Sequence, residues 1–210
     1  VPWSEYFISR FAGQPLKRLI LSCGPHHAQG EAMIANYGLE GGALYALGAA
    51  LREALQREGA ATLILDLRRD ISESELTARL KKPRGKKSLS TFLSSAAGLD
   101  PQSVALLRES FLTRGEPLPV EAQSLAQSIK ACQITVRGMQ GLDRAISSAG
   151  GLARDEVNSV LMIKKMPGVF VAGEMIDWDA PTGGYLLQAC FSTAVTASRG
   201  VIDWLQARAA

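Results

Sequence analysis

The stretch "GVFVAGEMIDWDAPTGGYLLQ", from Gly168 to Gln188, contains the features that decide the fold of this chain. Its first five residues are apolar without alternation, which predicts a central strand buried on both faces of a sheet. Ligands of open α/β sheets bind beyond the carboxyl ends of such strands. Gly173, Glu174 and Asp177 directly follow the predicted strand. The stretch therefore predicts a ligand site at this end of a sheet.

The second half of the stretch predicts the start of a helix. Thr182 can cap this helix, and Gly183 and Gly184 have no side chain to block its first N–H groups. Those N–H groups and the positive helix end suit a phosphate or another electron-rich oxygen, while the preceding carboxylates suit sugar hydroxyls. We therefore expect a nucleotide-like ligand. The residues leave an alternative equally open, in which the two glycines serve only a tightly packed turn between strand and helix.

The remaining sequence predicts a mixture of strands and helices. Short β-rich runs occupy residues 17–23, 31–37, 61–67 and 132–138, and "SVLMIKK" precedes the stretch quoted above. A helical pattern covers residues 40–59, and short capped helices fill residues 72–129. A closing helix is expected from Gly183 to about Ala207. Its apolar stripe consists of Leu187, Cys190, Phe191, Ala194, Val201, Ile202 and Leu205.

The composition allows a packed core and one or two domains in 210 residues, of which 47% are hydrophobic. A net charge of +3 does not by itself indicate nucleic-acid binding. No apolar run reaches the roughly 18 to 20 residues that span a bilayer, and the start resembles a piece of a longer chain more than a secretory signal. Three scattered cysteines form no disulfide framework, so we expect a cytoplasmic protein.

The segment "PGVFVAGEMIDWDAPTGGYLLQACFSTAVTASRG" closely resembles the C-terminal FAD-binding segment of bacterial flavoproteins of the aminoacetone-oxidase and bile-acid-reductase-like family. The stretches "RFAGQPLK", "YGLEGGALYALGAALR", "RGKKSLSTFL" and "AISSAGGLARDEV" extend the resemblance over nearly the whole chain. In that family the FAD domain consists of two separated pieces of chain, with a second domain inserted between them. The resemblance implies a mixed α/β (α+β) chain. Residues 1–130 would form the inserted strand-plus-helical-cluster domain, and residues 131–210 would return to a two-dinucleotide-type FAD-binding domain.

The resemblance also implies which residues contact FAD. Glu174 would face the ribityl and pyrophosphate region. The helix start at Gly183 and Gly184 would lie beside the pyrimidine edge of the isoalloxazine, where negative charge develops on reduction. The implied cofactor-binding residues are Gly173, Glu174, Asp177, Gly183, Gly184, Tyr185, Leu187 and Gln188.

The family begins with strand–GxGxxG–helix, which holds the ADP half of FAD and has no match in this sequence. We therefore expect an N-terminal Rossmann portion upstream of Val1 in the same parent chain. The function implied is part of a flavin-dependent oxidoreductase, with FAD-mediated hydride transfer to or from a small organic substrate and NAD(P)H as a candidate electron donor. No catalytic side chain, metal ligand or membrane partner is assigned. Two alternatives are a non-catalytic binding or oligomerisation module and an RNA-binding protein.

The RNA-binding alternative depends on "KKPRGKK", residues 81–87, which has five cations in seven residues. No aromatic residues interleave with these cations for base stacking. We therefore expect a solvated loop between helices.

Two further motifs each have an ordinary explanation. Cys23, His26 and His27 lie close enough to suggest a metal, but no fourth ligand is nearby, which favours a polar hairpin loop. "NYGLEGGALYAL" predicts a second helix start without bulky side chains, where Tyr37 or Tyr45 can line a substrate pocket. An ordinary core helix is the favoured explanation there.

Overall fold

The computed structural model describes residues 1–145, 148–180 and 183–209, and the chain forms two compact units. Unit 1 is Val1–Met139 and unit 2 is Gln140–Ala210. The sequence led us to expect the return to the FAD-binding domain at residue 131, whereas the compact units divide between Met139 and Gln140. The mixed α/β class is confirmed. Within the described ranges, no helix is both long and apolar enough to cross a membrane.

Unit 1 is built on a five-stranded antiparallel sheet with the order β3-β2-β1-β4-β5. Its strands are β1 (Pro15–Cys23), β2 (His26–Ala35), β3 (Gly38–Glu40), β4 (Ala61–Asp66) and β5 (Cys132–Val136). The four β-rich runs of the sequence therefore lie largely in strands, and β1 and β2 form a hairpin. His26 and His27 belong to β2, where they pair with Cys23 and Ser22, and not to the hairpin loop that the sequence favoured. A β-bulge interrupts β1 between Leu16 and Leu19, where Arg18 has a left-handed φ of 55°.

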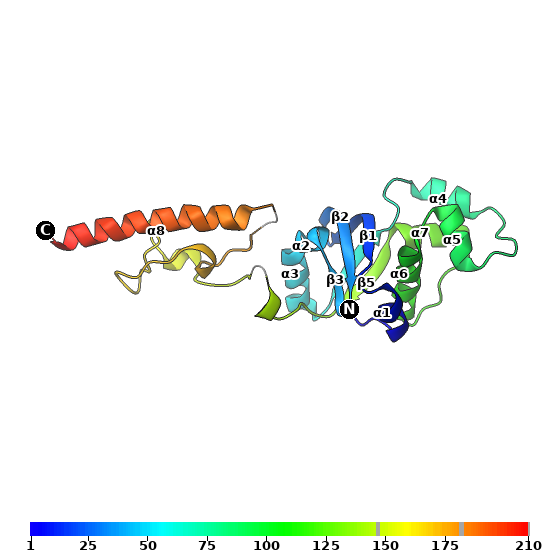
Figure 1. The fold of residues 1–210 in the computed structure, drawn as a ribbon, viewed down its shortest axis with the longest axis horizontal. Helices are drawn as coiled ribbons and strands as arrows, with labels where there is room; N and C mark the ends of the chain where they lie inside the picture. The colour runs from blue at the N-terminus through cyan, green and yellow to red at the C-terminus, as the bar shows by residue number, and fades with distance from the viewer. Residues whose placement is uncertain (146–147, 181–182, 210) are drawn as a thin grey trace. The chain divides into compact units, whose positions relative to one another are not determined.

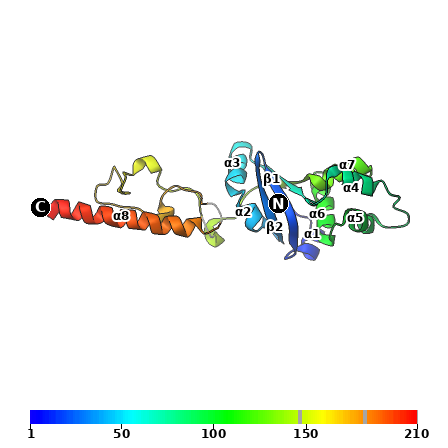
Figure 2. The ribbon, with the colours of Figure 1, turned by 90° about the horizontal axis from the view of Figure 1, so that it is seen from above.

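Seven helices described in unit 1 cover the sheet from both sides (Figures 1 and 2). The helices α2 and α3 lie on one side, and α1 and α4–α7 lie on the other. The core between the sheet and the helices is rich in leucine, because the strands and the inner faces of the helices both bury leucine side chains. The helices are α1 (Glu5–Phe11), α2 (Gly42–Tyr45), α3 (Gly48–Glu58), α4 (Glu73–Leu80), α5 (Leu89–Ala97), α6 (Pro101–Leu112) and α7 (Ala122–Lys130).

Side-chain caps start the helices where the sequence predicts. The Ser72 hydroxyl accepts the N–H of Glu75 at 3.2 Å, and the Asp100 carboxylate accepts the N–H of Ser103 at 2.8 Å. The single helix predicted for residues 40–59 is wrong, because it is split into α2 and α3. The break lies at Ala46 and Leu47, between the two helices. Gly41 sets where α2 begins: its φ is 119°, and an added Cβ would lie 3.1 Å from the Glu31 carbonyl oxygen of β2.

Unit 2 consists of one long helix, α8 (Tyr185–Ala209), and irregular segments held by isolated bridges. Short 3-10 turns are η1 (Leu142–Arg144), η2 (Arg154–Glu156) and η3 (Gly173–Met175). The central strand predicted at residues 168–172 is wrong: a single bridge, Met162↔Phe170, joins this run to the segment "SVLMIKK". A strand buried on both faces needs a neighbour at each edge, and residues 161–163 bond residues 169–171 along one edge.

The apolar residues of α8 form two faces rather than the single stripe that the sequence predicted. Small side chains face the loops of unit 2: Ala197 and Gly200 are buried, and a Cβ on Gly200 would lie 2.7 Å from Val160 Cβ. The large apolar side chains lie on an exposed stripe, which comprises Leu187, Phe191, Val195, Ile202 and Leu205.

Candidate cofactor site

Two predicted acidic residues are held by one loop in unit 2. The backbone N–H of Ser148 donates to Glu174 Oε1 at 3.1 Å, and that of Gly150 donates to Asp177 Oδ1 at 3.1 Å. Gly151 brings this loop close: a Cβ there would lie 2.8 Å from the Met175 carbonyl oxygen. Both carboxylates are exposed and retain unused acceptor capacity, since an ionised carboxylate accepts up to about four hydrogen bonds. They can therefore accept hydroxyl groups of a ligand.

Gly173 brings the acidic segment against α8. Its N–H donates to Thr193 Oγ1 at 2.9 Å, and the same hydroxyl donates to the Ala189 carbonyl at 2.6 Å. Gly173 has a φ of 63°, and an added Cβ would lie 3.2 Å from Cys190 Sγ. Only glycine suits both this conformation and this contact. Thr193 was missed by the sequence analysis, because a Thr inside a helix gives no indication of which loop it will bind.

The glycine pair at residues 183–184 precedes α8 and does not belong to it. Their φ values are 101° and 85°, a region that residues with a Cβ rarely adopt. A Cβ on Gly184 would meet no described atom within 4 Å, and one on Gly183 would meet only the Tyr185 ring, at 3.8 Å. No described residue crowds Gly184, and the positive φ of both glycines gives a conformational reason for them. Ligand approach and a packed turn both remain predictions.

The first turn of α8 presents N–H groups that bond no acceptor among the residues that the structure describes. Gln188 N–H bonds the Gly184 carbonyl at 3.2 Å, so the N–H groups of residues 185–187 precede the first intrahelical bond. The side chains of Tyr185, Leu187 and Gln188 are exposed around these donors. Thr182, the expected cap, lies outside the described residues. The helix start thus offers hydrogen bonds and a positive dipole end to an anionic group.

The eight predicted residues form two groups within unit 2. One group, at η3 and Asp177, offers carboxylate acceptors beside α8, and the other, at residues 183–188, offers N–H donors at the start of the same helix. A ligand with both hydroxyl and anionic groups suits this combination, and FAD is such a molecule.

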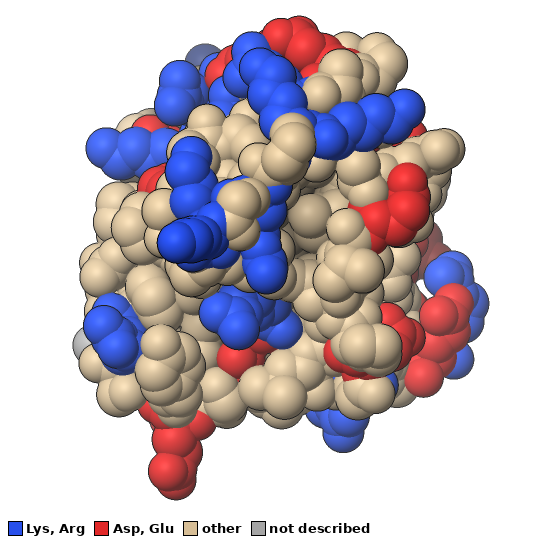
Figure 3. All heavy atoms as spheres, turned by 90° about the vertical axis from the view of Figure 1, so that its right-hand side faces the viewer, with Lys and Arg blue, Asp and Glu red and all other residues tan. Residues whose placement is uncertain are grey.

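The basic loop of residues 81–87 is fully exposed between α4 and α5, as predicted for a solvated loop. Figure 3 faces this end of unit 1 and shows Lys and Arg side chains crowding the upper part of its surface. A hollow of about 490 Å³ lies beside the loop, where Lys87 Nζ donates to Ser95 Oγ at 3.3 Å. Apart from Phe92, no aromatic side chain in the described residues lines this hollow.

The other two motifs both lie in unit 1. Burial raises the pKa of the Cys23 thiol, His26 and His27 are exposed, and the described residues contain no cluster of three metal-ligating side chains. The second predicted helix start lies at α2, which has only four residues. Tyr37 and Tyr45 are about half exposed, and the Tyr37 hydroxyl donates to Glu40 Oε2 at 2.6 Å.

Comparison with known proteins identifies the family. The sequence model of the HI0933-like protein barrel and H2TH domain matches residues 1–147, well over half of the chain. The chain belongs to the HI0933-like family. The antiparallel sheet and helices of unit 1 agree with a barrel and H2TH domain. This finding confirms the family resemblance that the sequence indicated.

One curated relative of this HI0933-like chain extends the comparison. The 3-dehydro-bile acid delta(4,6)-reductase of Clostridium scindens is 23% identical over 181 residues. The match covers 83% of this chain and 44% of the reductase. The chain thus spans less than half the length of this relative.

Proposed function

We propose that the chain forms part of an FAD-dependent oxidoreductase that transfers hydride to or from a small organic substrate. The observation that carries this proposal is the pair of exposed carboxylates beside the open start of α8 in a chain of the HI0933-like family. The reductase name of the C. scindens relative supports the reaction class.

The residues of unit 2 would hold different parts of the cofactor. The N–H groups of residues 185–187 suit an electron-rich oxygen, and Glu174 and Asp177 suit ribityl or ribose hydroxyls. Gly173 keeps the acidic segment against α8, so both sets of groups are pre-positioned. When bound, FAD supplies the hydride chemistry, with NAD(P)H as a candidate electron donor. No side chain of this chain is assigned as acid or base.

Unit 1 would be the inserted domain that shapes the substrate site, and unit 2 the return to the FAD-binding domain. This assignment moves the proposed boundary from residue 130 to the division after Met139. The free cysteines of the described residues are consistent with the proposed cytoplasmic location.

The exposed stripe of α8 supports an additional partner. Large contiguous apolar patches on a protein surface mark interaction sites, and five large apolar side chains lie along this helix with more than half of each exposed. We expect the N-terminal Rossmann portion of the parent chain to cover them. Because the ADP-binding half is expected in that portion, we expect the present chain alone to bind FAD weakly.

Flavin content of the full-length parent protein tests the proposal. We expect the wild-type protein to be yellow, Glu174→Ala to lower FAD affinity at least tenfold, and the matched change Glu156→Ala to leave it within twofold. Glu156 is a suitable control because it is also in unit 2 but pairs with Lys165 at 2.7 Å. A colourless parent protein whose RNA binding weakens steeply with salt would instead support the RNA-binding alternative.

A further inference from the structure

A pocket of about 400 Å³ opens in unit 1 where four segments meet. The β1 bulge contributes Lys17 and Arg18, β2 contributes Glu31, and the turn after β4 contributes Arg68 and Asp70. The fourth segment is the α5–α6 connection with the start of α6, from residue 98 to residue 103. This volume lies in the range of small-molecule sites. All lining residues belong to unit 1, so none of them is among the proposed cofactor-binding residues, which belong to unit 2.

Arg68 brings a half-buried positive charge to this pocket. Its Nη1 donates to the Ala97 carbonyl, and no carboxylate of the described residues lies within ion-pair distance of its guanidinium. Gly98 leaves room for the guanidinium, because an added Cβ there would overlap Nη1. A guanidinium has five N–H donors, and withdrawing a cation from water is unfavourable unless it is paired. Arg68 therefore has donors and charge available for an anion.

Ser103 is a second group without a partner. Its residue is only 4% exposed, and its hydroxyl makes no hydrogen bond to any residue that the structure describes. No fully buried side-chain oxygen or nitrogen of the described residues lacks a hydrogen-bond partner, so the Ser103 hydroxyl is open to solvent in the pocket that it lines. Ser103 lies in the first turn of α6, and its N–H already donates to the Asp100 carboxylate that caps this helix. The hydroxyl and Arg68 thus line one space.

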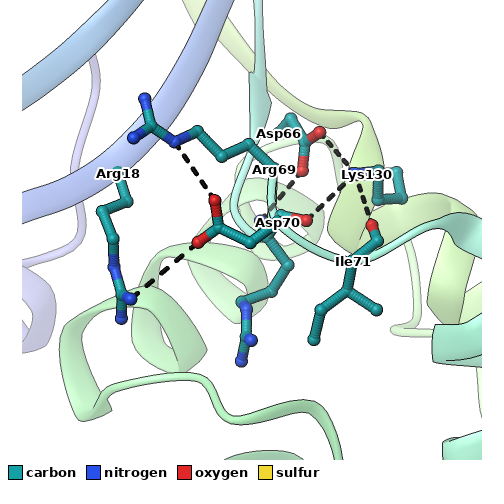
Figure 4. A network of polar contacts seen from close by, with 7 residues as sticks. Arg18, Asp66, Arg69, Asp70, Ile71 and Lys130 are labelled. Atoms are coloured by element: carbon teal, nitrogen blue, oxygen red, sulfur yellow. Dashed lines mark hydrogen bonds and ion pairs between the residues drawn. The ribbon is translucent and has the colours of Figure 1, made fainter.

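Polar contacts hold the turn that carries Arg68 in place (Figure 4). Lys130 Nζ pairs with Asp66 at 2.6 Å and donates to the carbonyls of Arg68 and Ile71 at 3.0 and 2.9 Å. Asp70 is shared between Arg18 at 3.8 Å and Arg69 at 3.5 Å, so its charge is already balanced. A site held in place before binding loses less entropy when its ligand arrives.

We propose that this pocket binds a small hydroxylated oxyanion, a molecule with one phosphate or carboxylate group and neighbouring hydroxyls. Arg68 and the Ser103 hydroxyl hold the anionic group, and Lys17 adds positive charge at the exposed edge. Glu31 and Asp100 line the same pocket and accept the hydroxyls. These acids repel an extended polyanion, so the pocket does not suit nucleic acid.

Calorimetric titration of the full chain with glycerol 3-phosphate and with glycerate tests the proposal and separates phosphate from carboxylate. We expect saturable binding of at least one probe. Arg68→Gln is expected to weaken it at least tenfold and Ser103→Ala about three- to tenfold, as one charge-assisted and one neutral hydrogen bond contribute. The control Arg108→Gln, an exposed residue of α6 that contacts Ser90, should stay within twofold.

A melting measurement separates lost binding from lost folding. Ser103→Ala should leave the melting temperature unchanged or raised, because its hydroxyl has no partner and alanine is the better helix former. Absence of saturation with both probes up to about 10 mM, or an equal loss in Arg108→Gln, would overturn the proposal. Flavin content of the parent protein should be unaffected by Ser103→Ala, so this site and the cofactor site fail independently.

Discussion

The ion pair between Lys130 and Asp66 allows a test of how burial changes the contribution of an ion pair to the free energy of unfolding. The Nζ–Oδ2 distance is 2.6 Å, and the two side chains are only 20% and 15% exposed. Arg79 and Glu75 form a pair of nearly the same length, 2.7 Å, on the surface of α4, with side chains 41% and 53% exposed. The two pairs differ in solvent exposure and in the two backbone carbonyls that Lys130 also contacts.

The two pairs are expected to differ severalfold in their effect on stability. Removing one partner of a fully buried pair costs about 3–5 kcal/mol, and this pair is partly hydrated, so we expect Lys130→Met to lower the free energy of unfolding by about 2–4 kcal/mol. The loss includes the bonds from Lys130 to two carbonyls. Arg79→Met should cost only about 0.3–0.5 kcal/mol, the value of an exposed i,i+4 pair.

Urea unfolding of the full chain measures both changes. With a slope of about 2 kcal/mol per molar urea, Lys130→Met should move the midpoint by about 1–2 M and Arg79→Met by about 0.2 M. Asp66→Asn completes a double-mutant cycle, since asparagine can still accept the Arg68 N–H that now bonds Asp66 Oδ1 at 2.9 Å. Equal losses for Lys130→Met and Arg79→Met would refute the reasoning.

Four further outcomes are expected. Gly200→Ala should destabilise unit 2 by about 1–3 kcal/mol through overpacking against Val160 and Phe170, while the exposed Ser198→Ala should not, as thermal melting would reveal. Gly184→Ala should cost about 1 kcal/mol through its φ of 85° alone, and Gly184→Asn less; equal melting temperatures for all three forms would contradict a conformational role. Burial raises the pKa of the Cys132 thiol to about 11, so the folded state keeps this thiol protonated while the unfolded thiol ionises near 9. The free energy of unfolding should therefore fall as the pH rises from about 9 to 11, and Cys132→Ser should reduce this slope. Replacing Lys82, Lys86 and Lys87 by Gln should leave flavin content and turnover of the parent protein within about twofold, because the loop is exposed; a tenfold loss in either would assign the loop a contact.

The sequence by itself determined most of unit 1. The runs at residues 17–23, 61–67 and 132–136 are strands because their alternating or continuous apolar residues can be buried against helices within the same unit. The caps Ser72 and Asp100 act within one turn of chain, so their local pattern was sufficient. Family membership was also visible in the sequence, because it depends on residue order and not on packing.

Tertiary structure alone decided the features that depend on contacts distant in sequence. Glycine is needed at positions 41, 151 and 173 because each position closely approaches other atoms. Only the structure shows which backbone or side-chain atoms these are. The run at residues 168–172 looked like a central strand, but an apolar pattern does not specify which strands pair with it. The pocket around Arg68 joins residues 17, 68 and 103, whose sequence separation conceals that they meet. Whether the Arg68 charge and the Ser103 hydroxyl have partners cannot be read from the sequence, because burial and hydrogen-bond partners exist only after the chain has folded.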